Sequence, residues 1–240
     1  LLSTEEASGA EKAELLIVIP AYNEAENIER VVNHLTANFP QYDYVVVNDG
    51  SRDETAAICQ RNGYNLLNLP VNLGLAGAFQ AGLKYADKYG YQYAVQLDGD
   101  GQHRPEYLES MIKKMEEGYD IVIGSRFVGE KKPFTMRMLG SNLIEMAIRF
   151  TTGVNIKDPT SGMRMFSKRM IREFASGLNY GPEPDTVSYL IRQGARVAEV
   201  PVIMDERILG VSYLTPVNAM RYMLKMLISI LLIQNFRKRR

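Results

Sequence analysis

The feature that most constrains the fold is an alternation of short apolar runs with longer helical patterns. Four runs rich in β-branched residues are typical of buried strands, at 15–20, 44–49, 93–98 and 120–125. Patterns with helical spacing lie between these runs, at 25–38, 53–62, 75–89 and 105–117. Strands that alternate with helices favour a mostly parallel sheet covered by helices on both faces. The sequence therefore predicts an α/β fold.

The second half of the chain is less regular. The sequence predicts a helix over 141–151, a turn entering a strand in "DPTSGMRMF" (158–166), a strand over 196–204 and a helix over 216–236. Asn23 and Glu26 resemble a capping arrangement for the first helix. No linker divides the chain, so we expect a lead-in over 1–13, one domain over 14–213 and an amphipathic C-terminal helix over 214–240. The change of pattern divides the domain into halves, 14–125 and 126–213.

Composition limits the class of protein. The 240 residues are 46% hydrophobic, enough for a sizeable core, and the 28 basic residues balance the 28 acidic ones. That balance gives no sign of a nucleic-acid partner. The single cysteine, Cys59, excludes an intramolecular disulfide and a cysteine-based zinc cluster, and it is predicted to be a small core residue on a helix face. No apolar stretch reaches the ~18 residues of a membrane span, and the nearest candidate is 226–233.

Acidic and polar residues gather where the predicted strands end. Asp98 and Asp100 follow the third strand in "LDGDG", Asp49 ends the second, and Tyr22 and Glu24 follow the first. Ligands bind beyond the carboxyl ends of strands in open parallel sheets, so these residues are expected in one crevice. The adjacent carboxylates repel each other unless a cation lies beside them. An ordinary acidic turn is the simpler interpretation, but the position favours Mg²⁺ or Mn²⁺, completed by substrate phosphates.

Basic residues of the second half indicate another anionic group. Arg126 closes the fourth strand, Arg164 lies in "TSGMR" and Arg207 lies in "ERILGVS". Arg137 and Ser141 are four residues apart and share a face if their segment is helical. The planar fork of arginine suits phosphate oxygens, although a surface ion pair is the alternative for each of these residues.

Seven motifs follow one another from about residue 15 to 213: "VIPAYNEAENI", "VVNDGSRDET", "NLGLAGAFQAGL", "LDGDGQHRPE", "IGSRF", "DPTSGMRMF" and "ERILGVS". In these motifs the chain resembles the inverting family 2 glycosyltransferases, especially the branch of dolichyl-phosphate mannose synthases and other polyprenyl-phosphate glycosyltransferases. The resemblance implies a GT-A fold with a nucleotide half at 14–125 and an acceptor half at 126–213. It also implies a UDP- or GDP-linked sugar donor.

The resemblance assigns expected roles on the donor side. Four residues match positions that hold the nucleoside: Pro20, Tyr22, Glu24 and Asp49. Asp98, Asp100 and Gln102 match the metal and diphosphate site, and Arg207 matches a loop arginine that binds the diphosphate. His103 lies beside the metal turn and is expected to orient it. Two positions depart from the family pattern: Asn48 replaces an acid, and Tyr213 replaces a lysine.

On the acceptor side, Arg126, Arg137 and Ser141 match residues that face the acceptor phosphate, and Asp158 matches an acidic position at the reacting centre. A phosphate monoester, with a second pKa of about 6, arrives largely ionised and needs no strong base. A sugar hydroxyl would need one, and Asp158, Glu183 or Asp185 would then be candidates.

The C-terminal pattern has two interpretations. Its apolar stripe consists of Met220, Met223, Leu224, Leu227, Ile230 and Leu231, and the last four residues are basic. In the first, the helix packs on its own core or on a sister subunit. In the second, it binds the surface of an anionic membrane, which would contain a polyprenyl acceptor. A small membrane partner protein is a further alternative. The resemblance implies a cytoplasmic enzyme, peripheral at the inner face of the membrane.

Two other functions stay open from the sequence. One is a GT-A transferase that acts on a sugar hydroxyl in polysaccharide synthesis. The other belongs to a different class and is a nucleotidyltransferase or a non-catalytic nucleotide-binding module.

Overall fold

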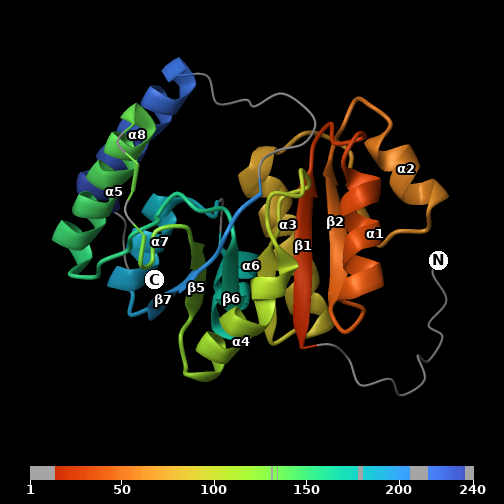
Figure 1. The fold of residues 1–240 in the computed structure, drawn as a ribbon, viewed down its shortest axis with the longest axis horizontal. Helices are drawn as coiled ribbons and strands as arrows, with labels where there is room; N and C mark the ends of the chain where they lie inside the picture. Colours follow the sequence, from red (N-terminus) through yellow and green to blue (C-terminus); the bar gives the residue numbers. More distant parts are fainter. Residues whose placement is uncertain (1–13, 131, 134, 178–180, 206–215, 236–240) are drawn as a thin grey trace.

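A seven-stranded sheet forms the centre of the molecule in the computed structural model, which describes residues 14–130, 132–133, 135–177, 181–205 and 216–235 (Figure 1). Its strands are β1 (Leu15–Ala21), β2 (Asp43–Asp49), β3 (Leu66–Leu69), β4 (Tyr93–Gln96), β5 (Ile121–Ser125), β6 (Arg164–Ser167) and β7 (Val197–Pro201). The strand order is β3-β2-β1-β4-β6-β5-β7. Only β6 runs antiparallel to its neighbours, β4 and β5, among these described strands. The predicted mostly parallel α/β sheet is confirmed.

Helices cover both faces of the sheet (Figure 1). They are α1 (Ile28–Asn38), α2 (Thr55–Arg61), α3 (Gly74–Tyr89), α4 (Leu108–Glu116), α5 (Met136–Thr152), α6 (Lys168–Ser176), α7 (Pro184–Arg192) and α8 (Pro216–Leu231), with short 3₁₀ helices η1 (Pro105–Tyr107) and η2 (Ile233–Asn235). One core contains side chains of α1, α2 and α4, and the other contains side chains of α3, α5, α6, α7 and α8.

The alternation of side chains along β1 explains its unbroken apolar sequence. Leu16 and Val18 lie in the core of α3 and its neighbours, whereas Leu15, Ile17 and Ile19 lie in the core of α1, α2 and α4. Successive strand residues point to opposite faces, and both faces are covered, so every residue of the run must be apolar.

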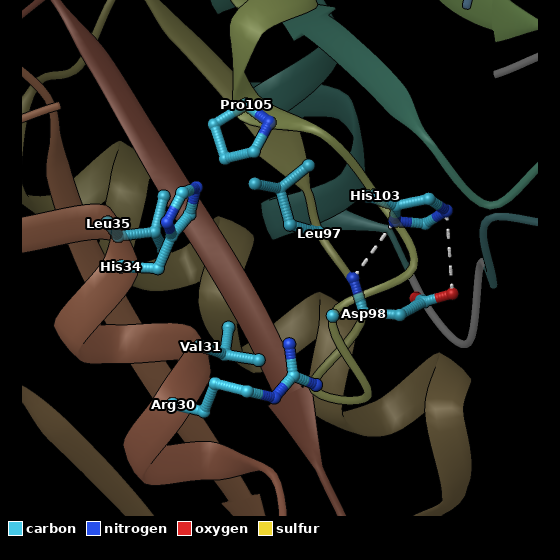
Figure 2. Close-up of a pocket in the computed structure, with 9 residues that line it drawn as sticks. Arg30, Val31, His34, Leu35, Leu97, Asp98, His103 and Pro105 are labelled. Atoms are coloured by element: carbon cyan, nitrogen blue, oxygen red, sulfur yellow. Dashed lines mark hydrogen bonds and ion pairs between the residues drawn. The ribbon is translucent and has the colours of Figure 1, made fainter. Parts of the chain in front are cut away.

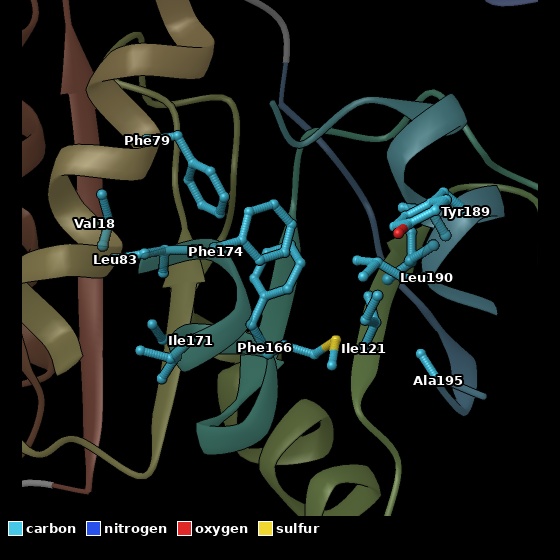
Figure 3. Close-up of a cluster of buried hydrophobic side chains, with 14 of the residues drawn as sticks. Val18, Phe79, Leu83, Ile121, Phe166, Ile171, Phe174, Tyr189, Leu190 and Ala195 are labelled. Atoms are coloured by element: carbon cyan, nitrogen blue, oxygen red, sulfur yellow. The ribbon is translucent and has the colours of Figure 1, made fainter. Parts of the chain in front are cut away.

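An aromatic cluster joins the two halves of the chain (Figure 3). The ring centroids of Phe79 on α3 and Phe166 on β6 lie 5.3 Å apart, and that of Phe174 on α6 lies 5.1 Å from Phe166. Edge-to-face and tilted contacts at such distances stabilise a core beyond the burial of area alone. The core on the α3 face of the sheet therefore contains residues from both halves of the chain.

Several elements differ from the sequence prediction. Strand β3 and helices α6 and α7 were not predicted, and α5 begins at Met136, ahead of the expected 141–151. The capping prediction for Asn23 is wrong, because α1 begins only at Ile28. Asn23 instead adopts a left-handed φ of 55° and accepts a hydrogen bond from the backbone N–H of Arg52 at 2.9 Å.

Two simpler expectations can be compared with the described residues. Cys59 is fully buried on α2, as predicted. None of the helices in the described ranges combines the length and the apolar composition needed to cross a bilayer. The expected lead-in over 1–13 lies outside the described residues.

Candidate active site

The carboxyl ends of four strands meet at one edge of the sheet. β1 is parallel to β2 and to β4, and β5 has the same direction because β6 runs antiparallel to both β4 and β5. This edge carries the segment after β1, the end of β2, the acidic turn after β4 and Arg126 after β5. The expected convergence of the strand ends is therefore present.

The acidic turn is held in a defined conformation by its own neighbours. Asp98 Oδ1 accepts a hydrogen bond from Gln96 Nε2 at 2.9 Å, and Asp100 Oδ1 accepts one from the backbone N–H of Gln102 at 3.1 Å. A Cβ at Gly99 would lie 3.2 Å from the carbonyl oxygen of Pro20, so glycine allows the turn to lie against the end of β1.

His103 holds the same turn from the interior (Figure 2). Its side chain is only 3% exposed, its Nδ1 accepts a hydrogen bond from the backbone N–H of Asp98 at 3.0 Å, and its Nε2 lies 3.6 Å from Asp98 Oδ2. Nδ1 can accept only when it carries no proton, so the neutral ring bears its proton on Nε2, which faces the carboxylate. These contacts agree with the expected orienting role.

The donor set of the turn suits a hard cation that also binds substrate. Asp98 and Asp100 offer carboxylate oxygens at a half-buried site. Within the described part of the chain, no group of three or more acidic, histidine or cysteine side chains could hold a metal ion by itself. Mg²⁺ and Mn²⁺ sites with one or two carboxylates are completed by water and phosphate oxygens, so the residues present fit a metal shared with a diphosphate.

The residues that were expected to hold the nucleoside lie around the ends of β1 and β2. Tyr22 and Glu24 are half-buried. The Glu24 side chain lies beside the turn, since a Cβ built at Gly99 would lie 3.5 Å from Glu24 Cγ. Asp49 is 3% exposed, and its Oδ1 accepts a hydrogen bond from the backbone N–H of Leu73 at 2.7 Å. In this conformation Asp49 fixes the start of α3 at the crevice.

Arg126 and Asp158 form a bidentate ion pair. Arg126 Nε lies 2.7 Å from Asp158 Oδ2, and Arg126 Nη2 lies 2.8 Å from Oδ1. Asp158 is fully buried, whereas the Arg126 side chain is 24% exposed. Nη1 of Arg126 has no hydrogen-bond partner among the described residues, so one edge of the guanidinium remains able to meet an anion.

The other predicted acceptor residues are placed less favourably or not at all. Ser141 is fully buried on α5, and its Oγ has no hydrogen-bond partner within the described ranges. It therefore does not present its hydroxyl to an acceptor in this conformation. The Arg137 side chain lies outside the described part of the structure, and Arg207 and Tyr213 lie outside the described residues.

The remaining carboxylates are bound by the C-terminal helix. Glu183 accepts a hydrogen bond from the hydroxyl of Tyr222, and Asp185 Oδ2 accepts one from Ser229 Oγ at 2.6 Å. Burial, together with the charge of Glu183, raises the pKa of Tyr222 far above its usual value of 10.0. These hydrogen bonds attach α8 to the start of α7 and engage both carboxylates.

Arg164, which the sequence offered as a phosphate ligand, is a structural residue. Its side chain is fully buried and donates to the carbonyl oxygens of Pro159 and Pro182. Complete burial lowers the pKa of Arg164 below its usual value, against the opposing effect of nearby acids. A phosphate in the crevice cannot reach a guanidinium that both flanking loops enclose.

Gln102 forms two hydrogen bonds with Asp205, the last described residue before the "ERILGVS" segment. Gln102 Nε2 donates to the carbonyl oxygen of Asp205 at 3.1 Å, and the backbone N–H of Asp205 donates to the carbonyl oxygen of Gln102 at 2.9 Å. Arg104 Nε also donates to Asp205 Oδ1 at 2.8 Å, which lowers the pKa of that carboxyl below 3.8. The acidic turn thus anchors the described end of the chain before this segment, at Asp205.

Two residues of the site were missed by sequence reasoning. Gln96 is 1% exposed at the end of β4, and its side chain orients Asp98. In the sequence, the only indication of this role was a polar residue within the apolar run "YAVQLD". Arg30 of α1 contacts the turn from a distant position, and no sequence signal indicated this contact.

Comparison with known proteins identifies the family. Residues 16–175 match the family model described as Glycosyl transferase family 2, and the chain belongs to this family. It is therefore a glycosyltransferase. It is 32% identical over 223 residues to the polyprenol monophosphomannose synthase of Mycolicibacterium smegmatis, covering 88% of this chain and 84% of that protein. It is 31% identical to the undecaprenyl-phosphate mannosyltransferase of Micrococcus luteus, covering 82% of this chain and 86% of that protein.

The fold is that of known GT-A enzymes. A crystal structure of glucosyl-3-phosphoglycerate synthase from Mycobacterium tuberculosis in complex with Mn²⁺, UDP and glucosyl-3-phosphoglycerate has a TM-score of 0.67. The match covers 92% of this chain and 79% of that one at 20% sequence identity. The expected GT-A fold is confirmed.

Proposed function

We propose that the protein transfers a sugar from a UDP- or GDP-linked donor to a polyprenyl phosphate, with inversion at the anomeric carbon and with the help of a divalent metal. The product is a lipid-linked sugar for glycan assembly. The names of the two mannosyl-transferring relatives support this acceptor class. The structural observation that carries the proposal is the acidic turn at Asp98 and Asp100, which shares one sheet edge with Arg126.

The donor side of the proposal follows from the residues at that edge. Asp98 and Asp100 would hold Mg²⁺ or Mn²⁺ together with phosphate oxygens, and the bound metal would neutralise the charge that develops on the leaving diphosphate. The sequence resemblance supports a nucleoside site at Pro20, Tyr22, Glu24 and Asp49. Arg207 is proposed to contact the diphosphate, and Gln102 to keep the metal turn in register with the segment that carries it.

The acceptor side of the proposal rests on charge and on the contacts of the three candidate bases within the described residues. Arg126 and Arg137 are proposed to bind the acceptor phosphate, without Ser141, whose hydroxyl is buried. Asp158 orients Arg126 rather than accepting a proton, since both of its oxygens bind that guanidinium. Glu183 and Asp185 likewise accept hydrogen bonds from α8. Engagement of all three candidate bases favours an acceptor that arrives ionised over a sugar hydroxyl.

The structure changes the expectation for the C-terminal stripe. Ile230 is fully buried and Met226 is 2% exposed, so one face of α8 packs on the domain. Other apolar side chains of α8 are exposed, and the helix lies beside α5, which also carries exposed apolar side chains (Figure 1). We call these exposed apolar side chains of the two neighbouring helices the α5–α8 apolar surface, and its members are Leu139, Leu143, Met146 and Phe150 of α5 and Met220, Leu224, Ile228 and Leu231 of α8.

This surface supports a peripheral contact with the membrane that holds the acceptor. Phe150 is 84% and Met220 68% exposed, and large exposed apolar patches mark interaction sites. Arg221 and Lys225 are exposed on α8, and four further basic residues end the sequence, which favours an anionic bilayer as the occupant. We propose that the enzyme works there, at the cytoplasmic face. A sister subunit or a small membrane protein on the same surface would be a different outcome of the tests below.

The first experiment is a transfer assay. The protein is incubated with Mg²⁺ or Mn²⁺, labelled UDP- and GDP-sugars, and undecaprenyl or dolichyl phosphate, and label is counted in the organic phase. Label should appear there with one donor and fall about 100-fold or more in Asp100→Ala, because an electrostatic contact to the leaving group is lost. Asp87→Ala on the exposed side of α3 is the control and should keep the activity.

Each other outcome has a defined meaning. Label on a water-soluble sugar acceptor would support polysaccharide synthesis on a hydroxyl. Transfer of the nucleotide, in place of the sugar, would support a nucleotidyltransferase. Donor binding without any turnover would support a binding module.

A further inference from the structure

Arg30 contacts the metal-binding turn although it lies almost seventy residues before it in the sequence. Its side chain extends from the first turn of α1 toward the turn after β4 (Figure 2). Arg30 Nη2 donates a hydrogen bond to the carbonyl oxygen of Asp100 at 2.9 Å. The contact therefore fixes the backbone of Asp100, a candidate metal ligand, and does not involve its carboxylate.

The guanidinium also fits closely over the next residue. Gly101 has a φ of +77°, and a Cβ there would lie 2.8 Å from Arg30 Nη2 and 2.9 Å from Nη1. A side chain at this position would displace the guanidinium as well as strain the backbone. The turn and the arginine are therefore matched in shape.

A chain of hydrogen bonds links this contact to the segment after β1. Arg30 Nη2 also lies 3.4 Å from Asn27 Oδ1, and Asn27 Nδ2 donates to Glu24 Oε2 at 2.9 Å. Asn27 is 1% exposed, so the middle of the chain is fixed by packing. Through these bonds the turn that carries Asp98 and Asp100 is connected to the segment proposed to hold the nucleoside.

We propose that Arg30 is a positioning residue of the metal site, which fixes the backbone of Asp100 so that the two carboxylates are arranged before the cation binds. The inference rests on the metal dependence of the proposed function, but not on the identity of the acceptor. Two effects of Arg30 oppose each other: its charge repels a cation, whereas its hydrogen bond reduces the ordering that binding requires. Because Arg30 is an exposed residue, its charge is screened by solvent and salt, and the positioning effect is the larger one.

The test compares Mn²⁺ affinity in the wild-type protein, Arg30→Met, Arg30→Lys and Arg61→Met. Arg61 lies on α2 in an exposed ion pair with Glu54, so Arg61→Met removes the same charge away from the turn. Mn²⁺ alone, and Mn²⁺ with saturating UDP, are titrated by following the electron paramagnetic resonance signal of the free ion. Arg30→Met should bind Mn²⁺ about five-fold more weakly, as expected for the loss of one hydrogen bond to a charged donor.

The two other variants separate contact from charge. Arg30→Lys should lie between wild type and Arg30→Met, because it keeps a charge and a single donor but not the planar fork. Arg61→Met should match the wild type. Hydrogen exchange of the metal-free protein gives a second readout: amides of residues 98–102 should exchange faster in Arg30→Met than in the wild type, and Arg61→Met should not change their exchange.

Several results would overturn the inference. Tighter Mn²⁺ binding in Arg30→Met would show that repulsion dominates, and unchanged binding with a lower melting temperature would show a merely structural role. Absence of Mn²⁺ binding by the wild type, with and without UDP, would remove the site itself. If the Mn²⁺ pattern is as expected but no polyprenyl phosphate is labelled, the acceptor proposal fails and the positioning role of Arg30 stands.

Discussion

Asp158 and Arg126 form a two-bond ion pair that joins the loop before β6 to the end of β5. The carboxylate is fully buried, and the distances are 2.7 and 2.8 Å. The backbone N–H of Arg126 donates to the same carboxylate at 3.0 Å. The pair therefore fixes the orientation of the Arg126 guanidinium and ties the two loops together.

Breaking this pair should destabilise the protein. Asp158→Asn is expected to lower the free energy of unfolding by about 3 kcal/mol, since it leaves a partly buried guanidinium without its counter-charge. In a double-mutant cycle with Arg126→Met, the summed single costs should exceed the double cost by about 1 kcal/mol or more. Urea unfolding measures both values. The exposed pair Glu109 and Lys113 is the matched control, and its coupling should stay below about 0.5 kcal/mol. Additive costs at Asp158 and Arg126 would contradict the reading of the pair as one unit.

The contact of α3 with β1 depends on a missing side chain. A Cβ at Gly82 would lie 2.2 Å from Val18 Cγ1, inside the contact distance. Gly82→Ala should therefore lower stability by about 1–3 kcal/mol, although alanine is the better helix former. Thermal unfolding checks the loss, and Val18→Ala in the same chain should restore part of it. A stabilised Gly82→Ala protein would show that the helix shifts at no cost.

The ion pair of Asp120 predicts a dependence of stability on pH. Burial alone would raise the pKa of Asp120, but hydrogen bonds from Arg169, the backbone N–H of Arg196 and Ser167 bring it below 3.8. The unfolded state then binds the proton more readily, so the stabilisation is present above pH 3.8 and is lost as the pH falls through the folded-state pKa. Asp120→Asn should cost about 1 kcal/mol at pH 7, because Arg169 is half-exposed.

The measurement for Asp120 is urea unfolding at pH 7 and near pH 3. The difference between wild type and Asp120→Asn should shrink at the lower pH. Glu54→Gln, in an exposed pair with Arg61, should change stability by less than about 0.5 kcal/mol at either pH. A difference for Asp120→Asn that does not depend on pH would show that hydrogen bonding, and not charge, carries the effect.

The α5–α8 apolar surface should govern binding to vesicles. Replacing Met146 and Phe150 by glutamate should weaken co-sedimentation with anionic vesicles about ten-fold or more, because apolar area is lost and negative charge is added. Tyr89→Glu, at an exposed aromatic position of α3, is the control and should bind as the wild type does. Binding should also fall as salt rises.

Point variants suit this question better than removal of the tail. Deleting 216–240 would uncover the sites that Met226 and Ile230 fill, and loss of binding could then follow from a damaged core. If the glutamate variant binds vesicles normally but changes a dimer into a monomer, a sister subunit covers the surface instead of lipid.

The sequence alone determined the α/β class, because continuous apolar runs of strand length must be buried on both faces of a sheet. It also located the acidic turn and the ends of β1 and β2, since short-range patterns mark where strands stop. The weakly patterned elements β3, α6 and α7 were missed: β3 is a short, half-buried edge strand, and the sequence around α6 and α7 carried no strong periodic signal.

Only the tertiary structure decided which polar groups pair. Arg126 and Asp158 are thirty-two residues apart, and Arg30 and Asp100 are seventy apart, so no local pattern reveals either contact. The same holds for Arg164: the sequence left a phosphate ligand and a surface ion pair open, and its buried contacts with carbonyl oxygens make it a structural residue. Burial and hydrogen-bond partners are set by elements distant in the sequence, and they decide whether a charged side chain serves the site or the fold.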